Sequence, residues 1–134
     1  MSNKDIVREF TRVVFNGRDL SQLDRFMRED YIQHSYGVET GRDGFIDFVV
    51  NRFFKEHPNL ELRIMNLFEI GDLVFSHNHA VLEEGVNEAV VFDIYRIQDG
   101  KLAEHWDCIQ PLKPEQMTPE NIKRIFDFSR ANLG

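Results

Sequence analysis

The sequence predicts an α+β domain in which three helices precede an antiparallel sheet and one helix follows it. Apolar residues recur at helical spacing over much of residues 3–56, and from residue 60 they alternate with polar residues at a period of two. Turn dipeptides divide the alternating region into four stretches, as in a strand meander. Helices grouped ahead of such a sheet are expected to cover one of its faces.

Three helices are predicted before the sheet. The first covers residues 3–15 and ends before Gly17, a residue suited to a left-handed helix cap. A second, shorter helix follows Asp19 or Ser21, whose side chains suit a helix start. The third covers about residues 44–56 and stops where a proline follows.

The remaining elements follow from turn signals. Tyr31–His34 is predicted to be a short extended segment, and the glycine-rich stretch 36–44 a loop. A last helix begins at Thr118-Pro119, because proline suits the first helical position. The four strands are predicted at residues 60–70, 73–83, 89–97 and 101–109.

Length and charge limit the possible partners. The chain has 134 residues, enough for one core, and twelve of them are phenylalanine. Its net charge of −7 and its lack of a basic cluster argue against nucleic-acid or membrane partners. A lone cysteine, no apolar signal core and no membrane-spanning run lead us to expect a cytoplasmic protein.

The first hairpin can be registered from its turn. A two-residue Gly71-Asp72 loop pairs Ile70 with Leu73 and, farther along, Asn66 with His77 and Ile64 with His79. The face that carries the two histidines is the more apolar one. We therefore expect His77 and His79 to point toward the helices, with Phe68 and Phe75 beside them as cavity walls.

The second hairpin allows two registers. A two-residue Asp99-Gly100 loop would put Asp107 on the face opposite Asp93. A three-residue loop that adds Gln98 would instead pair Asp93 with His105 and bring Asp93, His105 and Asp107 to one face. We favour the longer loop, because it separates polar from apolar side chains. The other face would then carry an apolar patch, covered by the last helix or by a second subunit: Phe92, Ile94, Leu102 and Trp106.

Asp93, His105 and Asp107 are the strongest candidates for chemistry. Burial raises the pKa of a carboxyl group, and a neighbouring negative charge raises it further. Such an aspartate can act as a general base near neutral pH. The simpler interpretation is structural: Asp93 pairs with Arg96 or with a backbone group, and His105 only completes the packing.

Other polar residues give weaker signals. His77 and His79 form a His-x-His pair that could bind a metal together with His34, His105 or Asp93, but the pattern is short and common. We expect them to be polar groups of a pocket or histidines bonded to buried backbone, with no metal and no cofactor. Cys108 is expected to serve packing.

Several segments resemble the SnoaL-like branch of the nuclear transport factor 2-like superfamily. They include Tyr31–His34, Gly71–Val74, Asp93–Arg96 and, most specifically, the Asp-Gly-Lys turn followed by Glu104–Asp107. The resemblance covers about residues 5–110. It departs from the family where Ser35-Tyr36 replaces the usual Asn-Pro, and where the tail 111–134 extends past the usual end.

The resemblance implies a cone-shaped α+β barrel, a curved sheet around a long helix, often dimeric through the sheet. In the polyketide cyclases of the family, an aspartate matching Asp107 acts as acid and base in an intramolecular aldol condensation without a cofactor, and a histidine matching His105 lies beside it. Other members only bind ligands or proteins. For this chain we expect one domain over residues 1–134, with a core of about residues 5–110 and a helical extension over residues 111–134.

We therefore expect a cofactor-free acid–base enzyme of the cyclase, isomerase or dehydratase type, acting on a small apolar carbonyl compound in a buried pocket. The alternative is a ligand-binding or assembly domain without catalysis. A homodimer through the outer sheet face is also expected. The predicted catalytic residues are Asp107, His105, Asp93 and His34, and the predicted ligand-binding residues are Tyr31, Phe68, Phe75, His77, His79 and Tyr95.

Overall fold

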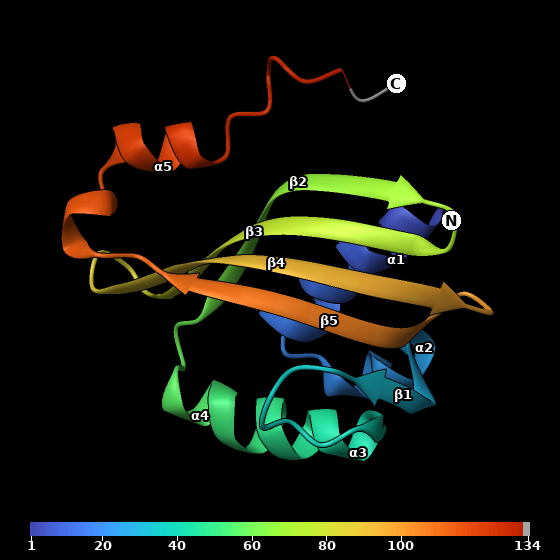
Figure 1. The fold of residues 1–134 in the computed structure, drawn as a ribbon. Coiled ribbons are helices and arrows are strands. Elements are labelled where there is room, and N and C mark those ends of the chain that lie inside the picture. The colour runs from blue at the N-terminus through green and yellow to red at the C-terminus, as the bar shows by residue number, and fades with distance from the viewer. Residues whose placement is uncertain (133–134) are drawn as a thin grey trace.

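The structure, a computed structural model, describes residues 1–132. A curved five-stranded sheet in the order β1-β5-β4-β3-β2 forms its centre (Figure 1). The strands are β1 Met27–Gln33, β2 Glu61–Ile70, β3 Leu73–Glu83, β4 Asn87–Gln98 and β5 Lys101–Pro111. The last four are the predicted antiparallel meander. The predicted sheet was one strand short, because β1 pairs with β5 in the parallel direction and adds a fifth strand.

The helices lie close to where the periodicity predicts them. Ser2 caps the first helix, because its hydroxyl accepts from the Asp5 amide while the Asp5 carboxylate accepts from the Ser2 amide. The third helix begins at Gly41, earlier than predicted. The helical segments are α1 Asn3–Phe10, η1 Thr11–Asn16, η2 Leu20–Gln22, α2 Leu23–Phe26, α3 Gly41–Phe45, η3 Ile46–Phe53, α4 Phe54–Glu56, η4 Pro114–Gln116 and α5 Pro119–Ile125.

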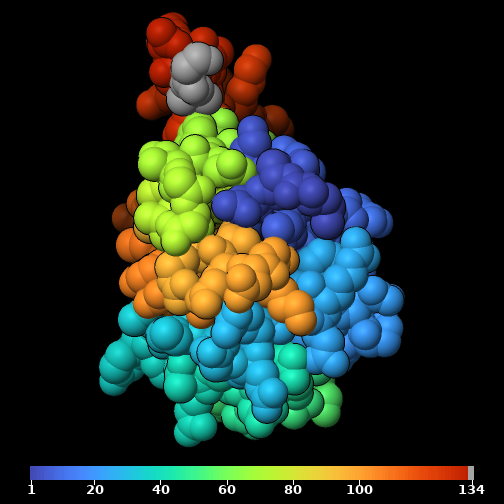
Figure 2. Space-filling view, turned by 90° about the vertical axis from the view of Figure 1, so that its right-hand side faces the viewer, coloured from blue at the N-terminus to red at the C-terminus, as the bar shows by residue number. Residues whose placement is uncertain are grey.

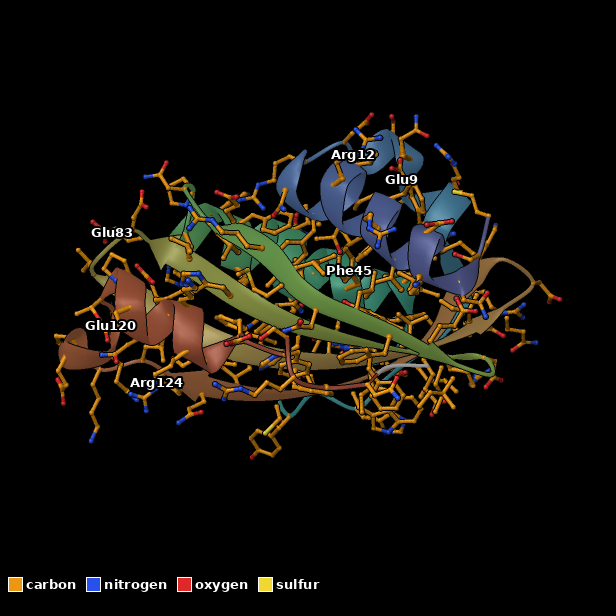
Figure 3. All side chains as sticks on the ribbon, turned by 90° about the horizontal axis from the view of Figure 1, so that it is seen from above. Glu9, Arg12, Phe45, Glu83, Glu120 and Arg124 are labelled. Atoms are coloured by element: carbon orange, nitrogen blue, oxygen red, sulfur yellow. The ribbon has the colours of Figure 1, made fainter. Side chains whose placement is uncertain are left out.

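The N-terminal helices cover one face of the sheet, which we call the inner face. Glu9 marks α1 and Arg12 marks η1 on one side of the strands in Figure 3, and Glu120 and Arg124 mark α5 on the other. The main core lies between the inner face and the N-terminal helices. Its buried residues are Ile6, Val7, Phe10, Val14, Leu23, Phe26, Met27, Tyr31, Phe45, Val74, Tyr95, Ile97 and Leu102.

The C-terminal segment covers part of the opposite, outer face. Phe126 is buried there against His77 and His79, and Phe128 stacks on Phe68 with ring centroids 5.6 Å apart. In Figure 2 the red C-terminal segment stands above the green β2–β3 hairpin, and the blue α1 lies lower and to the right. Both faces of the β2–β3 pair are therefore partly covered.

The first hairpin differs from its predicted register beyond Asn66. Ile70 pairs with Leu73 and Asn66 with His77 as predicted, but the register shifts between Ile64 and Asn66. Ile64 therefore pairs with Asn78 instead of His79.

The expected orientation of this hairpin is wrong. Ser76 and Asn78, which alternate with the histidines, face the helices, and His77 and His79 face outward with Phe68 and Phe75. The apolar pattern misled because tail aromatic residues, not the N-terminal helices, cover that face.

The second hairpin places Asp93, His105 and Asp107 on one face as predicted, but by a bulge instead of a longer turn. Its turn has the two residues Asp99 and Gly100, both with positive φ (52° and 75°), as type I′ turns require. The predicted three-residue loop is therefore wrong. A bulge at Ala103 then shifts the register, so that Tyr95 pairs with His105, and Asp93 pairs with Asp107 instead of the predicted His105. Leu102 is fully buried in the main core and does not belong to the outer patch.

Candidate active site

Asp93, His105 and Asp107 gather on the inner face of β4 and β5. Asp93 pairs directly with Asp107 across the two strands, and one ligand atom from each of the three residues lies within 4.8 Å of the others. Asp93 and His105 are buried, whereas Asp107 is half-buried. Two carboxylates and an imidazole thus share one small region under the helices.

The carboxylate of Asp93 is held from two sides. Its Oδ1 lies 2.7 Å from Nε2 of His105, and its Oδ2 accepts from Nδ2 of Asn78 at 2.8 Å. Asn78 is fixed in turn, because its Oδ1 accepts from the Ser76 hydroxyl at 2.7 Å. Arg96, which the structural interpretation paired with Asp93, forms its ion pair with Glu104 instead.

The second nitrogen of His105 meets a residue of β1. Nδ1 of His105 lies 2.8 Å from Oε1 of Gln33, and the backbone amide of Ser35 donates to that same oxygen at 3.0 Å. Both ring nitrogens thus face oxygens that accept. This arrangement fits a doubly protonated His105 that donates to Asp93 and to Gln33.

Asp107 is the member of the cluster that is free to take up a proton. The Ser35 hydroxyl donates to its Oδ2 at 3.1 Å. Burial raises the pKa of the Asp107 carboxyl above its usual value, and the charge of Asp93 raises it further, while His105 and Ser35 act in the opposite direction. The net upward shift brings Asp107 closer to the range of a useful general base.

Tyr31 and Tyr95 stack beside His105. Their ring centroids lie 6.5 Å and 4.8 Å from the imidazole centroid. Burial, and next the charge of Asp93, raises the pKa of both phenols well above the ordinary value, so both stay protonated. These two predicted pocket residues therefore lie beside the cluster.

His34 lies on the other face of the sheet, against the expectation that it joins the catalytic group. Its Nε2 is 2.6 Å from Oε2 of Glu104, and its ring stacks on Trp106 at 5.0 Å. The reason is that side chains alternate along a strand. Tyr31 and Gln33 face inward from β1, so His34, which follows Gln33 directly, faces outward.

The outer-face residues of β3 are also separated from the cluster. His77 packs among Phe92, Phe126 and Phe128, where burial lowers its pKa. His79 is buried with its Nε2 2.6 Å from Oε1 of Glu88. The expectation that His77, His79, Phe68 and Phe75 line the inner cavity is therefore wrong, because the face that carries them is the outer one.

Sequence reasoning missed four inner-face residues that hold the cluster together. Gln33, Ser35, Ser76 and Asn78 supply its supporting hydrogen bonds. The alternation within Tyr31–His34 contained a signal for Gln33, which shares a face with Tyr31. Ser35 carried no such signal, because it follows the end of β1.

Only one group of three possible metal ligands occurs among residues 1–132, and it is the Asp93–His105–Asp107 cluster. Its ligand atoms are close enough to meet one ion. Both nitrogens of His105 and both oxygens of Asp93 already have hydrogen-bond partners, so an ion would have to displace them. His77 and His79 do not form part of such a group.

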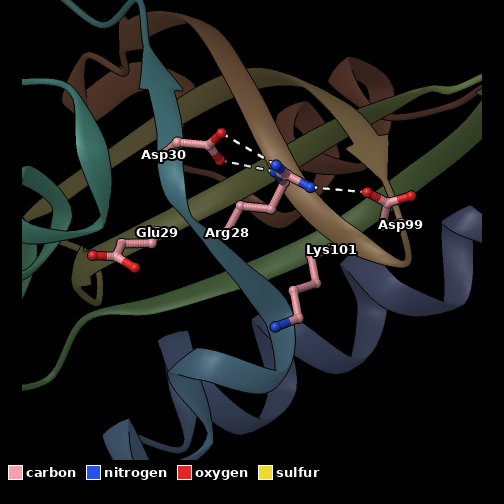
Figure 4. A pocket seen from close by; sticks show the side chains of 5 residues that line it. All are labelled: Arg28, Glu29, Asp30, Asp99 and Lys101. Carbon is pink, nitrogen blue, oxygen red and sulfur yellow. Dashed lines mark hydrogen bonds and ion pairs between the residues drawn. The ribbon is translucent and has the colours of Figure 1, made fainter.

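Two hollows on the surface of residues 1–132 lie away from the cluster. The larger, about 700 Å³, is lined by charged side chains: Arg28, Glu29, Asp30, Asp99 and Lys101 (Figure 4). Arg28 is held there by Asp30 and Asp99. The second is lined by Glu115, Gln116, Asn121, Arg124 and Ile125. The predicted ligand pocket next to Asp107 therefore stays a prediction.

By its fold, this chain is a small α+β protein whose curved sheet packs on N-terminal helices, and it carries its acidic cluster on the inner face of that sheet. The SnoaL-like domain family matches residues 7–105, which is most of the chain. This protein therefore belongs to the SnoaL-like family. No protein of curated function matches the sequence.

Solved structures of similar fold come from several bacteria. IdmH of Streptomyces antibioticus, a polyketide cyclase candidate, is 22% identical over 81% of this chain and 92% of its own, with a TM-score of 0.70. AclR of Streptomyces galilaeus, a hydroxylase candidate, is 21% identical over 85% and 92%, with a TM-score of 0.67. A polyketide cyclase candidate of Acidithiobacillus ferrooxidans is 16% identical over 94% and 97%, with a TM-score of 0.68. At these identities the likeness establishes the fold.

Among the described residues, no helix has both the length and the apolar character needed to cross a bilayer.

Proposed function

We propose that this protein is a cofactor-independent acid–base enzyme that acts on a small apolar carbonyl compound, with Asp107 as the general base. The observation that carries the proposal is a half-buried carboxyl with a raised pKa beside a buried aspartate–histidine pair. A base in this position needs no metal to remove a proton from the carbon next to a carbonyl group.

The reaction begins when the Asp107 carboxylate takes that proton. The electron pair of the broken C–H bond forms the C=C bond of an enolate and places charge on the carbonyl oxygen. In a cyclase the enolate carbon attacks a second carbonyl of the same molecule. The resulting alkoxide takes the proton from the Asp107 carboxylic acid, which restores the carboxylate. Return of the proton to a different carbon gives an isomerase, and loss of a β-hydroxide, which leaves as water with that proton, gives a dehydratase.

His105 and Asp93 have supporting roles in this proposal. A protonated His105 places positive charge near the forming enolate, which favours the charged intermediate. Asp93 holds the imidazolium through the 2.7 Å contact, and its own charge helps to raise the pKa of Asp107. His34 and His77, on the outer face, have no part in the reaction.

Half-exposed apolar residues of η3 support the choice of an apolar substrate. Ile46, Val49 and Val50 pack against the main core without being fully buried. Family membership and the cyclase descriptions of IdmH and of the Acidithiobacillus protein agree with a cyclase-type reaction.

Proton exchange tests the proposal without knowledge of the natural substrate. β-Tetralone, an apolar ketone with acidic hydrogens, is incubated with the protein in deuterium oxide, and loss of its α-proton signals is followed by NMR. We expect the wild-type protein to accelerate exchange and Asp107→Asn to lose at least about 100-fold of that acceleration, within the usual range for a general base.

An exchange rate equal to that of buffer, or equal in wild type and Asp107→Asn, would contradict catalysis by Asp107. Binding of β-tetralone without exchange would favour the alternative, a ligand-binding domain. Circular dichroism of the variant establishes that it is folded.

A further inference from the structure

Tyr95 has a buried side chain whose hydroxyl has no partner in the part of the chain that the structure describes. The residue is 7% exposed, and among residues 1–132 its hydroxyl makes no hydrogen bond. No fully sealed side-chain nitrogen or oxygen in this part of the chain is without a partner, so the Tyr95 oxygen still reaches open space. Because the ring is buried while the oxygen is open, the hydroxyl can donate to a molecule bound against it.

The surroundings of Tyr95 place it within the cluster. It pairs with His105 across β4 and β5, and its ring stacks on the imidazole at 4.8 Å. Its other ring neighbour, Phe10, offers no polar atom. Asp93 lies two residues away on the same face of β4 and pairs with Asp107, so Tyr95 neighbours the cluster that holds the proposed base.

The other buried tyrosine of the cluster is engaged. The hydroxyl of Tyr31 accepts from Nε2 of Gln33 at 3.3 Å, which ties it to the network around His105. The Tyr95 hydroxyl is outside that network. Its ring is fixed by packing, while its O–H remains available to a bound molecule.

We propose that the Tyr95 hydroxyl donates a hydrogen bond to the carbonyl oxygen of the substrate and strengthens this bond as the enolate forms. The proposal rests on the proposed function, because the oxygen that accepts this hydrogen bond is the one that becomes negative when Asp107 removes the proton. A fixed donor aimed at a developing oxyanion favours the transition state over the ground state. Burial raises the pKa of the Tyr95 phenol well above its usual value, so the donor is still protonated near neutral pH.

Tyr95→Phe tests this role because it removes one oxygen and keeps the ring stacked on His105. We expect β-tetralone exchange to fall by about 100-fold or more, the usual effect of losing one oxyanion donor. Tyr36→Phe is the matched control: Tyr36 is fully exposed, so exchange should remain at the wild-type rate.

Binding of β-naphthol supplies a readout independent of turnover. This planar molecule resembles the enol of β-tetralone, with its oxygen in the same place. Chemical-shift titrations should show weaker binding to Tyr95→Phe, by about 10-fold, than to wild type or Tyr36→Phe.

The two readouts separate the hypotheses. Full exchange and full naphthol binding in Tyr95→Phe, with exchange lost in Asp107→Asn, would overturn the role of Tyr95 and leave the proposed function intact. Absence of exchange in the wild type, with naphthol binding weakened only in Tyr95→Phe, would support the donor and contradict the enzyme.

Discussion

At the residue scale, the account depends on the different environments of two aspartates. Asp93 has a hydrogen-bond donor on each carboxylate oxygen, whereas Asp107, among residues 1–132, accepts from Ser35 alone and reaches solvent. One aspartate is thus held in place and the other is able to exchange a proton. Such a division of roles between two carboxyl groups is the pattern that acid–base sites require.

The raised pKa of Asp107 predicts how stability responds to pH. A carboxyl whose pKa is higher in the folded than in the unfolded state binds its proton more tightly when folded. Its stabilising contribution to the free energy of unfolding is fully present below the usual Asp pKa of about 4. It is lost as pH rises through the raised pKa.

Asp107→Asn should therefore be more stable than wild type near neutral pH, with the difference shrinking toward zero in acid. Thermal unfolding at several pH values measures this difference. A variant that is less stable than wild type near neutral pH would show that the ionised carboxylate is stabilised in the folded protein.

The central residues of the cluster could be predicted from the sequence, but its supporting residues could not. Alternation along two strands brings Asp93, His105 and Asp107 together whenever the hairpin register allows it. Gln33 and Ser35 reach the cluster only because β1 pairs with β5, a contact between segments about 70 residues apart for which a single sequence gives no register.

At the element scale, the bulge at Ala103 decides which residues of β5 face the helices. A regular ladder from the two-residue turn would place His105 opposite Ile94, on the outer face. One extra residue in β5 brings His105 opposite Tyr95 on the inner face and leaves Leu102 in the core. The sequence offered two ways to obtain the polar face, a longer turn or a bulge, and hydrophobic alternation could not distinguish them.

Deletion of Ala103 tests this view of the bulge. Without it, Leu102 and Glu104 become neighbours opposite Ile97 and Arg96, and the ladder becomes regular with His105 still inward. We expect the deletion to lower the free energy of unfolding by less than about 2 kcal/mol, within the common range for single changes.

Insertion of one alanine after Ala103 should cost more than the deletion, because two residues would then lack partners in β4. Urea unfolding compares the two variants. A deletion that costs more than the insertion would mean that the extra residue has a packing role beyond the register.

At the scale of the whole molecule, the helices and the C-terminal segment cover opposite faces of one sheet. The sequence predicted the layers and the last helix, but it assigned the Phe68 and His77 face to the wrong layer. An apolar face shows only that something covers it, and residues from the distant tail provide that cover here. The homodimer through the rest of the outer face stays a prediction, with half-buried Trp106 and exposed Cys108 on that face.

Phe126→Ala tests whether the tail is docked independently of the main core. Phe126 packs on His77 and His79, and its carbonyl accepts from Asn66 at 3.1 Å, but it is outside the main core. Truncation should release the tail at a cost of up to about 3 kcal/mol, the low end for losing a buried phenylalanine.

Limited proteolysis should then cleave the tail first, while thermal unfolding of the rest changes little. An Arg130→Ala control, at an exposed site of the same segment, should behave as wild type. Collapse of the whole fold in Phe126→Ala would contradict a separately docked tail.

The pH dependence of β-tetralone exchange, compared with the titration of the Asp107 carboxyl carbon by NMR, tests the central claim most directly. Since a base acts only when ionised, the account predicts that the exchange rate rises with pH. Its midpoint should coincide with the Asp107 titration, and both should lie above the usual Asp value. An exchange rate that does not change while Asp107 titrates would show that another group removes the proton.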